Sequence, residues 1–211
     1  MCWRAICTGL TLGLMVATAA PASGRATPPS GRATPPCGPP GASTLAADAQ
    51  ARVYSSGGVF GCTRGNPASV PLGGSTNSCL GSALIGPVAL AGATAAYAAE
   101  RCGVDTGSTS VAVRRLSDGR QLVSVPAGSP PAPESYTAVT AIVVRSGGGV
   151  AWIAVSRSLG RPHANIEVWR VTHGATRRLD TGPGVAQHSL RLHGGCLTWR
   201  DRNRTRSATL G

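Results

Sequence analysis

The chain has 211 residues, enough for one domain with a hydrophobic core behind an N-terminal extension. Its net charge is +12, and all 20 basic residues are arginine, which together with the excess of Ala, Gly and Pro is typical of a GC-rich coding bias. The arginines are scattered along the chain and only 4% of the residues are aromatic, so the composition argues against a nucleic-acid-binding protein.

The N-terminal segment has the pattern of an export signal. A single early charge, Arg4, precedes an uncharged run over residues 5–20, and Ala20-Pro21-Ala22 offers a small-x-small cleavage site. The run is shorter than the roughly 20 residues that cross a bilayer, so we expect no membrane span in the mature chain. We predict a signal peptide over residues 1–22 and a secreted, extracellular or cell-envelope protein.

Residues 23–43 are predicted to be a disordered, Pro/Gly-rich linker. The heptapeptide Ser-Gly-Arg-Ala-Thr-Pro-Pro occurs twice in succession, over residues 23–29 and 30–36. These repeats contain no apolar side chain larger than that of alanine, so they cannot bury enough surface to offset the entropy of ordering them. Their Pro-Pro pairs favour an extended tether.

Residues 44–211 are predicted to form an all-β domain, because short runs of Val, Ala, Leu and Ile alternate with Gly and Pro. Three stretches repeat one pattern: an apolar run, a break centred on glycine, and a second run that ends in an aromatic residue. The aromatic residues are Tyr97, Trp152 and Trp199, which lie 55 and 47 residues apart. A period near fifty with several strands per unit is typical of propeller blades, and we interpret the three aromatic residues as core anchors of successive blades.

Each repeat of this pattern, with the strands around it, is one unit. We predict that the units form about three propeller-like blades, each an antiparallel sheet of four strands. The strands of the first unit are expected over residues 88–90, 94–101, 110–116 and 121–125. Those of the second unit are expected over residues 138–145, 150–155, 165–171 and 176–179. The third unit, residues 190–210, supplies three strands. A hairpin over residues 52–61 and a strand over 69–72 resemble a blade whose beginning is missing. The two ends of the chain are therefore predicted to complete one another's blade. Whether the propeller closes within one chain or by oligomerisation stays open.

A family resemblance rests on two of these stretches. Residues 165–184 read NIEVWRVTHGATRRLDTGPG, and residues 145–152 before them read RSGGGVAW. Together they resemble the WD40-like blades of TolB-type β-propellers, in which a turn precedes an apolar-aromatic strand and a later strand ends in Arg-Arg-Leu. The resemblance covers about 120 residues and implies a propeller-like fold. The chain as a whole also resembles secreted proteins of high-GC actinobacteria that carry no assigned activity.

Five cysteines follow the leader: Cys37, Cys62, Cys79, Cys102 and Cys196. Their wide spacing, without a Cys-x-x-Cys pair, is a poor match to a metal site, so we predict no metal and no cofactor. Cys79 precedes one predicted strand and Cys102 ends its antiparallel neighbour, which places both at the same end of the sheet. We therefore predict a Cys79–Cys102 disulfide, for which Cys62 competes with either partner. The pairing of Cys37, Cys62 and Cys196 stays open.

Two copies of Asp-Thr-Gly, beginning at Asp105 and Asp180, resemble the loops of aspartic proteases, in which two facing carboxylates share a proton and activate water. The copies lie 75 residues apart, which is short for the β-barrel lobe that each loop requires. An Asp-Thr-Gly segment also makes an ordinary turn, since Asp bonds its own backbone and Gly accepts a positive φ. An aspartic-protease-like hydrolase that uses Asp105 and Asp180 is therefore the alternative function.

The architecture favours an exported, non-catalytic β-propeller-like module that binds an extracellular protein or an anionic envelope polymer. A large positive charge raises the affinity for anionic polymers. The one dense basic cluster reads RDRNRTR over residues 200–206. Strand alternation is expected to place its arginines on one solvated face of a hairpin.

Overall fold

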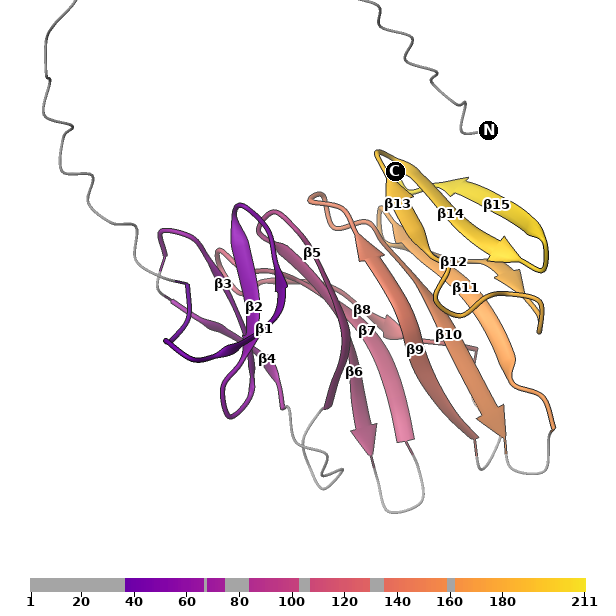
Figure 1. The fold of residues 1–211 in the computed structure, drawn as a ribbon, viewed down its shortest axis with the longest axis horizontal. Helices are drawn as coiled ribbons and strands as arrows, with labels where there is room; N and C mark the ends of the chain where they lie inside the picture. The colour runs from indigo at the N-terminus through magenta and orange to yellow at the C-terminus, as the bar shows by residue number, and fades with distance from the viewer. Residues whose placement is uncertain (1–36, 67, 75–83, 103–106, 130–134, 159–161) are drawn as a thin grey trace, which may run out of the picture.

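The computed structural model describes residues 37–66, 68–74, 84–102, 107–129, 135–158 and 162–211 (Figure 1). These residues contain fifteen β-strands and no helix, and the strands form four antiparallel meanders, each with its strands in chain order. The predicted all-β fold of antiparallel, propeller-like sheets is confirmed, and the described residues form four sheets where about three blades were predicted. In the described part of the chain there is consequently no helical segment that could span a membrane.

The four sheets are called A to D in chain order. Sheet A contains β1 (Ser43–Ala47), β2 (Ala51–Ser55), β3 (Val59–Thr63) and β4 (Val70–Gly73). Sheet B contains β5 (Leu84–Ala91), β6 (Thr94–Cys102), β7 (Gly107–Arg115) and β8 (Gln121–Pro126). Sheet C contains β9 (Ser135–Val144), β10 (Val150–Ser158), β11 (Asn165–Thr172) and β12 (Ala175–Thr181). Sheet D contains β13 (Arg191–His193), β14 (Cys196–Asp201) and β15 (Arg204–Thr209).

The sheets stack in chain order across the molecule (Figure 1). Their first strands lie next to one another, since β5 contacts both β1 and β9, and β9 contacts β13. This is the arrangement of neighbouring propeller blades, in which the first strand of each meander is innermost. Hydrogen bonds between turns add polar links between sheets; the backbone N–H of Gly92 in sheet B, for example, donates to the carboxylate of Asp48 in sheet A at 2.7 Å.

Strand alternation explains how the central sheets are buried on both faces. In β10, Val150, Trp152 and Ala154 pack toward sheet B, whereas Ala151, Ile153 and Val155 pack toward sheet D. Every one of these side chains is buried. A strand covered on both faces reads as a continuous apolar run, which is what the sequence shows here.

The repeated aromatic residues are core anchors, as predicted. Tyr97, Trp152 and Trp199 are all buried, and each lies on the second strand of its sheet and packs against the preceding sheet. Tyr54 on β2 is a fourth member of the series. The turn before β2 lacks the glycine of the other repeats; instead the carboxylate of Asp48 accepts hydrogen bonds from the backbone N–H groups of Gln50 and Ala51.

Sheet A is therefore a complete blade, and the prediction that its beginning is missing was wrong. β1 pairs with β2 and supplies the first strand, so sheet A has four strands and sheet D has three. Within the described ranges, the two ends of the chain do not contribute to a common sheet. The sequence signal was weak because β1 reads STLAA and has one large apolar residue, Leu45, which is exposed.

The outer face of sheet A, where a preceding sheet would pack, is covered by the chain itself. Residues 37–42, called the N-terminal cap, lie against this face. A disulfide joins Cys37 of the cap to the fully buried Cys62 of β3. Gly38 approaches the ring of Tyr54 so closely that a Cβ at this position would lie 2.7 Å from a ring carbon.

The outer face of sheet D is polar instead of being covered by a cap. Its inner face carries Leu197 and Trp199, which pack on sheet C. Apart from Cys196, strand register places only polar or charged residues on the other face. They are Arg191, His193, Thr198, Arg200, Thr205, Ser207 and Thr209. A polar outer face is how the terminal unit of a repeat protein avoids presenting apolar surface to solvent.

We predict that the cap stabilises the domain through its disulfide. The Cys37–Cys62 bridge spans 25 residues, so replacing both cysteines with alanine should lower the free energy of unfolding by about 3 kcal/mol, chiefly by freeing the unfolded chain. Urea denaturation of the double variant and of the unmodified protein measures this difference. Equal free energies of unfolding would show that the disulfide contributes nothing to stability.

Candidate functional site

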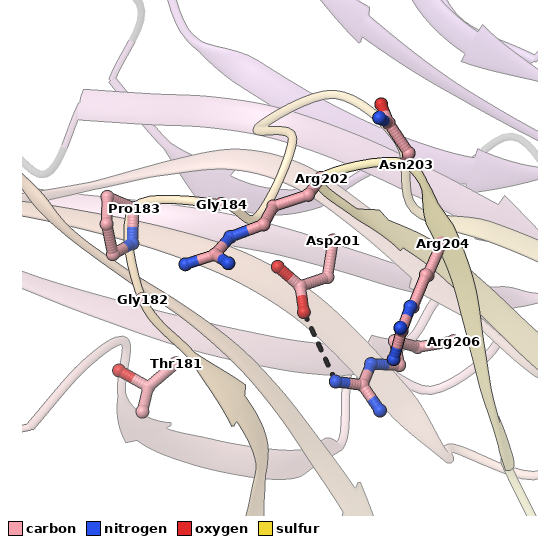
Figure 2. Close-up of a pocket in the computed structure, with 9 residues that line it drawn as sticks. All are labelled: Thr181, Gly182, Pro183, Gly184, Asp201, Arg202, Asn203, Arg204 and Arg206. Atoms are coloured by element: carbon pink, nitrogen blue, oxygen red, sulfur yellow. Dashed lines mark hydrogen bonds and ion pairs between the residues drawn. The ribbon is translucent and has the colours of Figure 1, made fainter.

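A cavity of about 500 Å³ opens between the ends of sheets C and D and is called the arginine pocket (Figure 2). Two segments line it: the loop that follows β12, and the hairpin that joins β14 to β15. The lining residues are Thr181, Gly182, Pro183, Gly184, Asp201, Arg202, Asn203, Arg204 and Arg206.

Close backbone contact holds the two walls of the arginine pocket together. The backbone N–H of Arg202 donates to the carbonyl of Gly184 at 2.7 Å. A Cβ on Gly184 would lie 2.5 Å from Oδ1 of Asp201, so a larger residue here would displace the Asp201 side chain. Arg202 sits at the hairpin tip with a φ of 53°, a left-handed conformation that is uncommon for a residue with a side chain.

The turn at Arg202 and Asn203 divides the basic cluster. Arg206 lies opposite Trp199 in the strand register, whereas Arg200 lies opposite Thr205. Arg204 and Arg206 therefore share the face that looks toward sheet C, and Arg200 is on the other face. The prediction that all the arginines of residues 200–206 share one face was wrong, because the strand reverses direction inside the cluster.

The charges of the arginine pocket are unbalanced. Nη2 of Arg206 lies 3.3 Å from Oδ2 of Asp201 in the one ion pair among the lining residues (Figure 2). The Arg206 side chain is 51% exposed, so this pair contributes little to stability. Figure 2 shows the guanidinium of Arg202 between Asp201 and the loop of Gly182, Pro183 and Gly184, called the glycine loop. Three guanidinium groups against one carboxylate leave the pocket positive, and planar guanidinium groups bind phosphate, sulfate or carboxylate through paired hydrogen bonds.

Asp180 lies at the end of β12, next to the arginine pocket, and has a structural partner. Its Oδ2 accepts a hydrogen bond from the indole N–H of Trp199 at 2.7 Å, and its Oδ1 accepts one from the backbone N–H of Thr181. These bonds join sheet C to sheet D and shape the turn. Asp105 lies outside the described residues, so the predicted pair of facing carboxylates stays a prediction.

The predicted Cys79–Cys102 disulfide is likewise untested, because Cys79 lies outside the described residues and only the backbone of Cys102 is described. The structure assigns Cys62 to Cys37. Within the described ranges, no three His, Cys, Asp or Glu side chains come together as metal ligands would.

A second polar site, Glu167 on β11, is fully buried on the side of sheet C that faces sheet B. Its carboxylate accepts hydrogen bonds from the backbone N–H and the hydroxyl of Ser129, at 2.9 and 2.6 Å. The indole of Trp169 donates at 3.2 Å, and the guanidinium of Arg178 donates at 2.9 Å. Burial raises the pKa of Glu167, but the hydrogen bonds from Ser129, Arg178 and Trp169 together lower it by more, so the pKa lies below its ordinary value.

Aromatic contacts extend this network across sheet C. The rings of Trp152 and Trp169 stack with centroids 6.4 Å apart, and Arg178 lies 5.8 Å from the centroid of Trp169. The indole N–H of Trp152 donates to the carbonyl of Ala127, which precedes Ser129 in the segment after β8. Residues 127–129 therefore link sheet B to the aromatic ladder of sheet C.

Comparison with known proteins identifies no family for this chain. No protein-family model and no curated protein sequence matches the chain. Among solved structures, the chain is similar to the hydrazine synthase of Kuenenia stuttgartiensis, with 14% sequence identity and a TM-score of 0.46. The alignment covers 79% of this chain and 51% of that one, so the chain spans about half of its length. A similarity at this level supports no conclusion about activity, and the resemblance to TolB-type blades stays a prediction.

We predict that Glu167 makes the free energy of unfolding fall at acidic pH. The pKa of Glu167 in the unfolded chain is near 4.5, and its pKa in the folded state is lower. The stabilisation that Glu167 contributes is therefore complete above the unfolded pKa and is lost as the pH falls through the folded pKa. Glu167→Gln should lack this pH dependence and should lower the free energy of unfolding at pH 7 by about 1–3 kcal/mol, because the hydrogen bonds to a buried charge are lost. Urea denaturation between pH 3 and 7 measures both effects.

The matched control is Glu100→Gln, because the Glu100 side chain makes no hydrogen bond or ion pair among the described residues. It should leave the stability at pH 7 almost unchanged. If Glu167→Gln retained the acid dependence of the unmodified protein, the dependence would belong to other carboxylates.

Proposed function

We propose that the protein is an exported, non-catalytic binding module whose arginine pocket takes an anionic group of a cell-envelope polymer. The observation that carries this proposal is the charge of one cavity: Arg202, Arg204 and Arg206 line it together with a single carboxylate, Asp201. The volume of about 500 Å³ lies within the range of small-molecule sites, so it accommodates an acidic substituent and part of the group that bears it.

Exposure of the guanidinium groups fits a polymer ligand. All three arginines are exposed, and the pocket that they line lies between the strand ends of sheets C and D. Affinity at such a surface comes largely from charge attraction and falls as salt screens it. Specificity comes from the glycine loop and the hairpin, which hold the guanidinium groups around one cavity.

Export is supported by the pattern of the first 22 residues and by the Cys37–Cys62 disulfide. Disulfides persist in oxidising compartments and are rare in the reducing cytosol. The hydrolase alternative has no observation in its favour among the described residues, because Asp180 is engaged with Trp199 and its proposed partner, Asp105, is not described.

We predict that inorganic pyrophosphate binds the arginine pocket and that Arg204→Gln weakens its binding about tenfold. A charge-assisted hydrogen bond is worth about 1.5 kcal/mol or more, which corresponds to roughly a factor of ten in affinity. Isothermal titration calorimetry at low salt gives the dissociation constants, and a second series at high salt gives their dependence on screening.

Arg200→Gln is the matched control, because it removes the same charge from the opposite face of the same hairpin. Its affinity for pyrophosphate should stay close to that of the unmodified protein. Equal losses in both variants would indicate diffuse attraction to the basic hairpin, and no loss in either would refute the arginine pocket as the binding site.

A further inference from the structure

A second cavity of about 260 Å³, called the tyrosine pocket, lies between the ends of sheets B and C. Its lining includes Glu100 and Arg101 at the end of β6, Ser108 at the start of β7, and Tyr136 at the start of β9. The volume is slightly below the roughly 300 Å³ at which typical ligand pockets begin. It therefore suits one small ring rather than an extended segment.

Tyr136 stands apart from the other aromatic residues of the domain. Its side chain is 55% exposed, whereas Tyr97, Trp152 and Trp199 are buried in the core. Among the described residues, Tyr136 and Leu45 are the exposed large hydrophobic side chains. A phenol ring at the mouth of a pocket offers an apolar face for stacking and a hydroxyl that can donate or accept.

The polar side chains around Tyr136 are available to a ligand. No hydrogen bond or ion pair within the described part of the chain engages the side chain of Glu100, Arg101 or Ser108. A carboxylate accepts hydrogen bonds, a guanidinium donates them, and a hydroxyl does both. The three side chains together therefore match a ring that carries several hydroxyl groups. Glu100 balances Arg101, and this pocket therefore lacks the positive excess of the arginine pocket.

The two pockets lie at equivalent positions in sheets B and D. Each is built from the end of the second strand and the start of the third strand of a meander, β6 and β7 in sheet B and β14 and β15 in sheet D. Sheet C lies between sheets B and D and contributes residues to both pockets, Thr181 of β12 to one and Tyr136 of β9 to the other.

We infer that the tyrosine pocket binds a neutral sugar ring stacked on Tyr136, and that the ligand is an anionic polysaccharide. This inference rests on the proposed function, because it assigns the acidic substituents of the same polymer to the arginine pocket. Stacking on Tyr136 contributes affinity that does not depend on salt. The guanidinium groups contribute electrostatic affinity, which salt weakens by screening.

The test compares three kinds of probe: pyrophosphate, which is an anion without sugar; neutral dextran; and two anionic polysaccharides, dextran sulfate and carboxymethyl cellulose. Tyr136→Ala should weaken the binding of at least one anionic polysaccharide about five- to tenfold, the worth of an aromatic contact. It should leave the affinity for pyrophosphate unchanged. Tyr136→Phe should retain most of the polysaccharide affinity, because it keeps the ring.

Leu45→Ala is the control for loss of an exposed apolar side chain, and it should bind every probe like the unmodified protein. Unchanged binding of both anionic polysaccharides by Tyr136→Ala would overturn the sugar site. If Arg204→Gln bound pyrophosphate normally while Tyr136→Ala still lost polysaccharide affinity, the arginine pocket would fail and the sugar site would stand. Thermal unfolding of each variant confirms that the fold is intact.

Discussion

Each meander in this protein has two faces that must be covered, and this constraint organises the whole domain. A single four-stranded sheet cannot bury its apolar side chains alone, so each sheet packs on the next, and strands such as β10 become apolar on both faces. The two outermost sheets of the described residues cover their free faces in different ways. At one end the N-terminal cap covers sheet A and is held by the Cys37–Cys62 disulfide, and at the other end sheet D turns a polar face to solvent.

The same constraint decides where pockets form. The faces of the sheets are occupied by packing, so polar side chains gather at the ends of the strands, where the turns project beyond the core. Both pockets are built there, between neighbouring sheets, from residues that the core does not use. Under the proposed function, the packed sheets beneath them hold the loops of sheets C and D in place, and this pre-organisation would reduce the entropy lost when a ligand binds.

Glu167 is an exception to the separation between an apolar interior and polar turns. A buried carboxylate is costly unless its oxygens are satisfied, and Ser129, Trp169 and Arg178 satisfy them. These partners come from the segment after sheet B and from two strands of sheet C, so the network favours one alignment of the two sheets. Its sequence signal is a lone acidic residue between the apolar neighbours Ile166 and Val168, which by itself does not reveal a partner.

The sequence by itself determined the β-class, the positions of most strands and the three buried aromatic anchors, because alternation, glycine turns and a repeat near fifty residues are local or periodic properties. It did not reveal sheet A as a complete blade, since the turn at Asp48 uses a carboxylate where the other repeats use glycine. Only the tertiary structure joined Cys37 to Cys62, divided the arginine cluster at its turn, and placed Tyr136 beside Glu100 and Arg101. Those relationships depend on which sheet packs against which, and residues that are distant in the chain meet there without any pattern that links them in the sequence.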